Sequence, residues 1–222
     1  MFDMEKLSKG VASKIAVELN LDNDNKEVIA YGAFAILHML LCIMLAIVFG
    51  ALFGVLVETL IISFIVSILR KYSGGVHAST PGICAAIGTI VSVGLGKVAL
   101  IISYFLSLKF LLVLGIITFI VAYYIVYKLA PVDSPAKPIK KIEKIKRMKK
   151  GSMIILSFYL LFVVLNIILF ITSRNRSFVI CSLCIYVGVL WQVLTLTYSG
   201  SVLFTYLDSF FNHIQTYIGR GI

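Results

Sequence analysis

The chain has 222 residues, of which 60% are hydrophobic and only 14% are charged, and it carries a formal net charge of +10. Its mean hydropathy of +1.05 is far above what a soluble domain of this length needs to fill its core. The composition therefore excludes a soluble globular protein and predicts an integral membrane protein.

The segment 1–26 has a helical repeat of apolar residues with lysines among the polar positions. The repeat consists of Met4, Leu7, Val11, Ile15 and Leu19. We expect an amphipathic helix lying in the cytoplasmic membrane interface, with a soluble cap packed on the helical bundle as the alternative. The apolar run that follows is too long for the core of a signal peptide, so no cleavable signal is expected.

Several apolar segments approach or exceed the length of a membrane-spanning helix, which needs about 20 residues. They cover about residues 28–49, 52–69, 82–107, 110–128, 152–172 and 178–207. The sequence therefore predicts an all-α polytopic membrane protein with about six transmembrane helices. We expect residues 1–222 to form a single membrane-embedded domain.

The four cysteines lie in or beside apolar segments, which gives no disulfide framework of the secreted kind. Cys181 and Cys184 form a C-x-x-C pair inside a predicted helix, where small packing residues are a better interpretation than a metal or redox pair. We expect no metal and no cofactor.

The basic residues are unevenly distributed along the chain. All but four of the 20 Lys and Arg residues fall in segments that six spans would place on one side, and the exceptions are Lys97, Lys109, Arg174 and Arg176. The positive-inside rule then places both termini in the cytoplasm. The segment 70–84 and the basic loop 129–150 should share that cytoplasmic face.

The loop 129–150 contains Lys137, Lys140 and Lys141 and continues with further basic residues to Lys150. This run is typical of an orientation signal that contacts anionic lipids. It could also attract an acidic peptide.

A polar, glycine-containing segment, RKYSGGVHASTPGIC, joins the second and third predicted spans at residues 70–84. It contains both His77 and Cys84. A thiol becomes a nucleophile as a thiolate, and a nearby imidazole is a common means of forming one. The pair therefore suggests cysteine-dependent acyl transfer, although each residue alone is more typical of an interfacial or packing side chain.

Thr80 and Pro81 have the pattern of a helix start, with a hydroxyl N-cap before a proline at the first helical position. Cys84 would then lie at the end of the first turn. There the helix dipole favours a thiolate, and free backbone N–H groups could hold an oxyanion.

His77 and Cys84 are too far apart on one straight helix for direct proton transfer, so the chain must bend between them. Ser79 and Thr80, with the residues that follow, can supply this bend. Upstream, Gly74 and Gly75 permit unusual backbone conformations or close approach of a substrate. Arg70 and Lys71 add positive charge that favours a thiolate and an anionic substrate.

The segment Arg70 to Cys84 resembles the signature of the AgrB family, the accessory gene regulator membrane endopeptidases of Gram-positive quorum sensing. A second segment, YKLAPVDSPAKP at residues 127–138, resembles the proline-containing loop of that family. Length and polytopic layout agree, so the resemblance covers essentially the whole chain.

The resemblance implies a cysteine endopeptidase that cuts a membrane-bound propeptide of the AgrD type near its C-terminal segment. Cys84 would be the nucleophile and His77 the general base, supported by Arg70 and Gly75. A Cys or Ser of the propeptide would capture the thioester, giving a thiolactone or lactone. The expected partners are this propeptide, with an acidic tail drawn to the basic loop, and anionic lipids, but no nucleic acid.

Two roles stay open at this stage. Asp133 could orient His77, but a structural role in its Pro-containing turn is favoured. Gly88, Ser92 and Gly96 recur at four-residue spacing, which fits either a homodimer contact or packing against a neighbouring helix of the same chain.

Two other classes of function compete with the peptidase. A small transporter or channel could use Glu58 and His38, ionisable groups in predicted spans, together with the helix break near Gly74. A non-enzymatic scaffold could bind anionic lipid or peptide through the basic loop.

Overall fold

The computed structural model describes residues 4–133 and 141–219, with side chains up to residue 214. It divides into two compact units, residues 1–45 and 46–222. All residues of the predicted peptidase site that the structure describes lie in the second unit. The single-domain organisation stays a prediction.

The first unit contains α1 (Met4–Glu18) and most of α2 (Asn23–Leu52). The Asp22 side chain accepts a hydrogen bond of 2.9 Å from the Asn25 backbone N–H and so caps α2. In α1 the buried row consists of the small residues Ser8, Ala12 and Ala16. The predicted apolar row lies beside it and leaves Leu7 and Val11 exposed. The helix is confirmed, and its position in the membrane interface stays a prediction.

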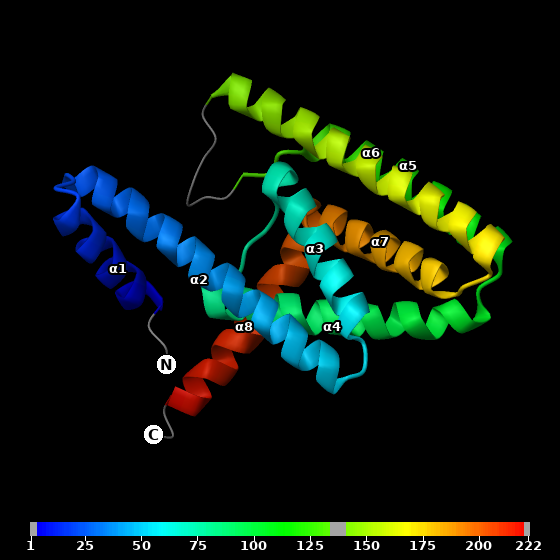
Figure 1. Ribbon diagram of the computed structural model, residues 1–222, viewed down its shortest axis with the longest axis horizontal. Helices are drawn as coiled ribbons and strands as arrows, with labels where there is room; N and C mark the ends of the chain where they lie inside the picture. Colours follow the sequence, from blue (N-terminus) through cyan, green and yellow to red (C-terminus); the bar gives the residue numbers. More distant parts are fainter. Residues whose placement is uncertain (1–3, 134–140, 220–222) are drawn as a thin grey trace. The chain divides into compact units, whose positions relative to one another are not determined.

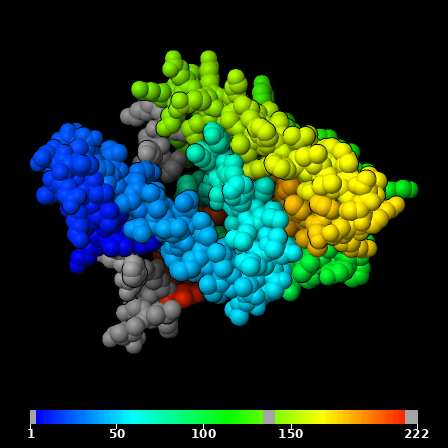
Figure 2. Space-filling model, viewed as in Figure 1, coloured from blue at the N-terminus to red at the C-terminus, as the bar shows by residue number. Residues whose placement is uncertain are grey.

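The second unit is a helical bundle (Figure 1). Its helices are α3 (Leu56–Ser73), α4 (Pro81–Phe105), α5 (Leu108–Leu129), α6 (Ile142–Ser173), α7 (Ser177–Leu194) and α8 (Tyr198–Gly219). The central helix is α7, because it contacts α3, α4, α5 and α6. Figure 2 shows α3 and α6 on one face of this unit, with part of α7 visible between them.

The core of this unit is apolar and formed around α7. Tyr186 packs edge-on against Phe119 of α5, with ring centroids 6.3 Å apart. Close packing also uses small residues: a Cβ on Gly188 would lie 3.0 Å from Ile65 of α3. Across the bundle, the Tyr159 hydroxyl of α6 donates a hydrogen bond of 3.0 Å to the Ile65 carbonyl. These contacts fix the relative positions of α3, α5, α6 and α7.

Five helices are long and apolar enough to cross a membrane, namely α2, α4, α5, α6 and α7. The all-α polytopic class is therefore confirmed. The second predicted segment forms α3, an 18-residue helix that carries Glu58, Arg70 and Lys71, and it is not among the five. The prediction of one span over residues 178–207 was wrong. The helix is interrupted at residues 195–197, so that α7 and α8 are separate helices.

The small residues of α4 pack within the chain at two of three positions. A Cβ on Gly96 would lie 3.1 Å from the Cβ of Glu58 on α3, and Ser92 is buried. Gly88 is exposed, and a Cβ there would meet nothing within 4 Å. The row therefore serves contacts inside this chain at Ser92 and Gly96, and a homodimer stays a prediction.

Candidate active site

The ends of several helices meet at one end of the second unit, which we call the polar end. It comprises the C-terminal ends of α3, α5 and α7, the N-terminal ends of α4 and α6, and α8. A parallel β-bridge joins Gly74, after α3, to Val132, after α5. Its hydrogen bonds run from Val132 N–H to the Ser73 carbonyl (2.9 Å) and from Gly75 N–H to the Val132 carbonyl (3.4 Å). The segment 70–84 and the start of the basic loop therefore lie at the same end of the bundle, and the cytoplasmic location of this end stays a prediction.

The basic residues that the sequence assigned to the other side lie at the opposite end of the bundle. Lys97 donates a hydrogen bond of 3.3 Å to the Phe53 carbonyl, between α2 and α3. Arg176 Nη1, at the start of α7, donates to the carbonyls of Ser103 (2.7 Å) and Tyr104 (3.1 Å) near the end of α4. These side chains satisfy carbonyls at helix ends, which accounts for their presence there.

Gly74 and Gly75 form a turn in a conformation that other residues rarely adopt. Their φ angles are +68° and +133°. A Cβ on Gly74 would collide with the Val132 carbonyl oxygen, and one on Gly75 would lie 2.7 Å from Thr195 Oγ1. The two glycines are therefore required by backbone conformation and by close packing.

Gln192, near the C-terminal end of α7, stabilises the Gly74–Gly75 turn by hydrogen bonds. Its Nε2 donates hydrogen bonds to the Gly74 carbonyl (2.8 Å) and to Ser73 Oγ (3.0 Å). Gln192 and Ser73 are both fully buried. The next backbone contact runs from the Val76 N–H to the Thr195 carbonyl (3.3 Å). The sequence analysis missed Gln192; a lone amide in the apolar run of a predicted span was the available signal.

The start of α4 agrees with its predicted cap. Thr80 has an extended backbone, its Oγ1 accepts a hydrogen bond of 3.3 Å from the Ile83 N–H, and Pro81 occupies the first helical position. Cys84 is half-buried in the first turn. The predicted oxyanion site is corrected, however, because Ile83 N–H bonds to Thr80 Oγ1 and Cys84 N–H bonds to the Thr80 carbonyl. Among the described residues, only the Gly82 N–H of this turn lacks a protein partner.

The charge of Arg70 acts electrostatically on both predicted catalytic residues, Cys84 and His77. The Cζ of Arg70 is 5.7 Å from the centroid of the Phe204 ring of α8, which is a cation–π contact. Among the described residues, its Nε and Nη2 atoms are buried and make no hydrogen bond. Buried N–H donors without partners can bind an incoming carbonyl, oxyanion or carboxylate.

His77 lies in the loop before α4 and is exposed to solvent on part of its surface. Partial desolvation of the ring, and then the positive charge of Arg70, lower the pKa of His77 below its ordinary value. A neutral imidazole at pH 7 can accept a proton. Within the part of the chain that the structure describes, no hydrogen bond joins this ring to Cys84, so the two side chains are neighbours of Arg70 but not yet a bonded pair.

The remaining predicted residues lie around this centre. Lys71 is exposed, with its Nζ 5.9 Å from the Tyr72 ring centroid. Asp133 is exposed and directly follows the bridge residue Val132. Lys141 precedes α6 as its exposed N-cap residue. Lys137 and Lys140 lie outside the described residues.

A carboxylate outside the predicted site residues also binds the loop. Asp208 of α8 accepts hydrogen bonds from the backbone N–H and the hydroxyl of Ser79. Ser79 was predicted only as part of the bend. The signal for Asp208 was weak, because it directly follows the predicted span 178–207 and belongs to no recognisable motif.

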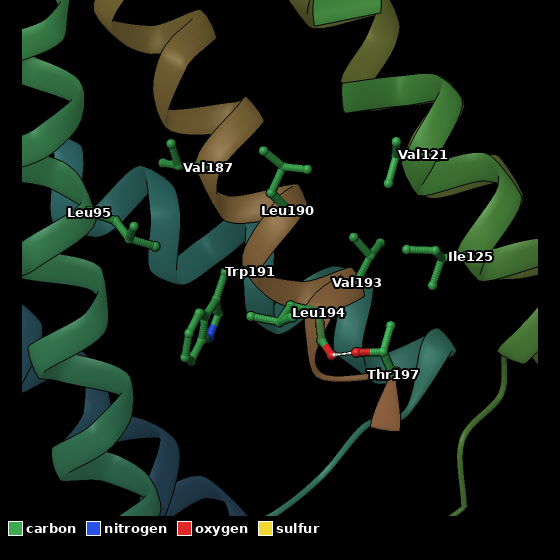
Figure 3. Close-up of a pocket in the computed structure, with 9 residues that line it drawn as sticks. All are labelled: Leu95, Val121, Ile125, Val187, Leu190, Trp191, Val193, Leu194 and Thr197. Carbon is green, nitrogen blue, oxygen red and sulfur yellow. Dashed lines mark hydrogen bonds between the residues drawn. The ribbon is translucent and has the colours of Figure 1, made fainter. Parts of the chain in front are cut away.

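An apolar pocket of about 430 Å³ lies between α4, α5 and α7, next to the polar end (Figure 3). It is lined by side chains such as Leu95, Ile125 and Trp191. The one hydroxyl drawn there, that of Thr197, donates to the Leu194 carbonyl at 2.8 Å. The pocket offers no nucleophile or base, so we place the chemistry at the polar end.

Fold and site together define a multi-pass α-helical membrane protein with a thiol, an imidazole and a guanidinium gathered at one end of its bundle. Comparison with known proteins identifies the family. The pattern of the accessory gene regulator B (AgrB) family matches residues 8–196, and the chain belongs to this family.

Two relatives come from Clostridium perfringens. AgrB-like protein 2 of strain 13 (type A) is 44% identical over 213 residues, covering 95% of this chain and 99% of its own length. The AgrB-like protein of strain SM101 (type A) is 42% identical over 213 residues, with the same coverage. No solved structure matches this chain.

Proposed function

We propose that the protein is a membrane cysteine endopeptidase that cleaves the C-terminal part of an AgrD-type propeptide and promotes cyclisation of the product. The observation that carries this proposal is that Arg70, in the last turn of the helix that leads into the loop of His77 and Cys84, has buried Nε and Nη2 atoms without a partner among the described residues. Family membership supports the choice of substrate.

In the first step His77 takes the thiol proton of Cys84, when the two side chains approach each other transiently in the free protein and more persistently once substrate is bound. The thiolate attacks the scissile carbonyl, and the tetrahedral oxyanion is stabilised by N–H groups of Arg70 and by the Gly82 N–H. When the carbon–nitrogen bond breaks, the imidazolium returns its proton to the leaving amine. The product is a thioester on Cys84.

In the second step a Cys or Ser side chain within the bound propeptide attacks the thioester. The new bond closes a thiolactone or lactone, and the Cys84 sulfur leaves and regains a proton. The thioester stays activated, and an internal nucleophile held close to it competes well with water. This step requires no further residue of the protein.

The charge of the polar end suits an acidic propeptide tail. Lys71 is exposed, and the first turns of α6 carry basic residues up to Lys150. Lys149 packs over the Tyr127 ring of α5, with its Nζ 4.2 Å from the centroid, which holds this helix start next to the end of α5. Contacts with anionic lipid headgroups would use the same charges, and we place this end at the cytoplasmic face.

The test is reconstitution in liposomes with a cognate propeptide, followed by mass spectrometry of the products. Wild-type protein should release the tail and yield the cyclic product, whereas Cys84→Ala should yield neither while remaining folded. Cys181→Ala, a thiol elsewhere in the bundle, is the matched control and should be active. Cleavage by the Cys84→Ala variant would contradict the mechanism, and a transporter or scaffold would tolerate that change.

A further inference from the structure

Helix α8 is bonded to the bend between His77 and Cys84. Asp208 Oδ1 accepts hydrogen bonds from the Ser79 N–H (2.8 Å) and from Ser79 Oγ (2.9 Å). One turn further along α8, Asn212 Nδ2 donates to Ser79 Oγ (3.0 Å) and to Asp208 Oδ2 (3.2 Å). The N–H and the hydroxyl of Ser79 thus have all their hydrogen-bond partners on α8, more than a hundred residues away in the sequence.

These bonds are not needed to satisfy the backbone. Ser79 is exposed, so water could serve its N–H and its hydroxyl. A carboxylate that accepts both donors of one residue instead selects one conformation, and bonds to an ionised acceptor are stronger than neutral ones. The hydrogen bonds therefore fix the backbone conformation at Ser79, and they are not required to satisfy a buried polar group.

Ser79 lies at the joint between the two proposed catalytic residues. On its N-terminal side, the backbone around His77 is anchored by the bond from Val76 N–H to the Thr195 carbonyl. On its C-terminal side, Thr80 caps α4, the helix that carries Cys84. The orientation of the imidazole relative to the thiol therefore depends on the backbone at Ser79.

The same helix contributes a second contact to the site. Phe204, one turn before Asp208, is buried, packs against Trp191 with ring centroids 5.9 Å apart, and carries the Arg70 guanidinium on its face. Because Phe204 is fixed in this way, α8 keeps a defined position against the polar end. Asp208 is presented to the loop by a helix that is itself packed.

We propose that Asp208 is a positioning residue, which acts through Ser79 to fix the bend that directs His77 towards Cys84. Its catalytic consequence rests on the proposed peptidase function. Asp208 contacts neither Cys84 nor His77 in the bonds described above, so its removal should impair the chemical step rather than substrate binding. A misplacement of about 1 Å in a reacting group can cost about 100-fold in rate.

The first experiment measures propeptide cleavage in liposomes for Asp208→Ala, Asp208→Asn and the control Ser209→Ala, which changes the adjacent exposed residue. Asp208→Ala should lower kcat by about 10- to 100-fold with KM within about twofold. Asp208→Asn should recover most of the rate, because its amide oxygen can accept both bonds from Ser79. A kcat of Asp208→Ala equal to that of Ser209→Ala would overturn the proposal.

The second experiment needs no substrate and therefore separates this proposal from the peptidase proposal. In a chain with Cys42, Cys181 and Cys184 changed to Ala, the rate of Cys84 alkylation by iodoacetamide is followed against pH. Asp208→Ala should slow alkylation as His77→Ala does, and Asp208→Asn should not. If no propeptide is cleaved by wild type but this pattern holds, only the peptidase proposal fails.

A purely structural role for Asp208 predicts a different result. It would lower the yield or the melting temperature of the variant and leave the rates per folded molecule unchanged, which would contradict the positioning role. If Asp208→Ala does not fold, the double variant Asp208→Ser with Asn212→Ala replaces it, because the shorter hydroxyl takes the acceptor away from the Ser79 N–H and hydroxyl while a polar side chain stays at position 208. Full kcat and full alkylation rate in that double variant would equally overturn the proposal.

Discussion

The buried amide of Gln192 donates a hydrogen bond of 2.8 Å to the carbonyl of Gly74, which joins the last turn of α7 to the first residue after α3. The same nitrogen donates to Ser73 Oγ, so one side chain fixes both residues at the start of the turn. Gly75 follows directly and cannot carry a side chain there. The loop that carries His77 thus starts from a rigid point.

Gln192→Leu should impair both stability and the proposed activity. It removes the Nε2 donor from the buried Ser73 hydroxyl and from the Gly74 carbonyl, which keeps only the longer bond of 3.3 Å from Ser73 Oγ. We expect a cost of about 1–3 kcal/mol of unfolding free energy. We expect a lower melting temperature in detergent and at least a tenfold decrease in kcat. Thr172→Ala is the control, since its hydroxyl bonds only to carbonyls of its own helix, α6. Equal activity of the two variants would contradict the role of Gln192.

Arg70→Lys should reduce kcat by about 100- to 1,000-fold although it keeps the positive charge. An ammonium group cannot reproduce the planar N–H groups that we assign to the oxyanion. Lys71→Gln is the matched control, because Lys71 is adjacent and exposed. We expect that control to raise KM in a salt-dependent manner and to leave kcat nearly unchanged, as measured by single-turnover cleavage. Full kcat in the Arg70→Lys variant would exclude the oxyanion role.

The pH dependence of kcat/KM should show an acidic limb set by His77. Partial desolvation and the charge of Arg70 lower the pKa of His77, so the imidazole is neutral at pH 7 and becomes protonated only at a more acidic pH than an ordinary histidine. Activity is therefore retained at neutral pH and lost on acidification. Arg70→Gln removes the positive charge that lowers the pKa of His77. The pKa should therefore rise, and the acidic limb of the residual activity should move to higher pH. An unchanged limb would mean that another group titrates.

Gly75→Ala should abolish activity, whereas Gly94→Ala should not. At Gly75 the φ angle is +133° and a Cβ would lie 2.7 Å from Thr195 Oγ1. At Gly94, exposed on α4, nothing lies within 4 Å, and alanine favours the helix by about 1 kcal/mol. Cleavage rates and melting temperatures of the two variants provide the comparison, and normal kcat in Gly75→Ala would show that the turn geometry is dispensable.

Labelling with a membrane-impermeant maleimide should place the polar end in the cytoplasm. In a chain without its native cysteines, Ser79→Cys should react only after permeabilisation, whereas Asn175→Cys, exposed between α6 and α7, should react in intact cells. The reverse pattern would contradict the positive-inside assignment. An N-terminal tag protected in intact cells would show in addition that α3 crosses the membrane.

Local features of the site were predictable because they depend on neighbouring residues. Thr80 and Pro81 predicted the start of α4, and the structure confirms both the cap and the first turn that contains Cys84. The break between α7 and α8 was not predicted, since residues 195–197 contain no Pro and no charge to mark the end of the helix. The oxyanion hypothesis was partly wrong. It required free N–H groups in the first turn of α4, but the Ile83 N–H donates to the capping hydroxyl of Thr80.

The sequence by itself determined that this is a polytopic helical membrane protein with an imidazole and a thiol in one polar loop, because hydropathy, charge and cap signals are properties of short segments. Only the tertiary structure decided which distant groups support that loop. Gln192, Asp208 and Phe204 reach it from α7 and α8, and such contacts depend on how helices pack rather than on any local pattern. The geometry of the loop is therefore set in large part by residues that follow it by more than a hundred positions, together with the bridge from Gly74 to Val132.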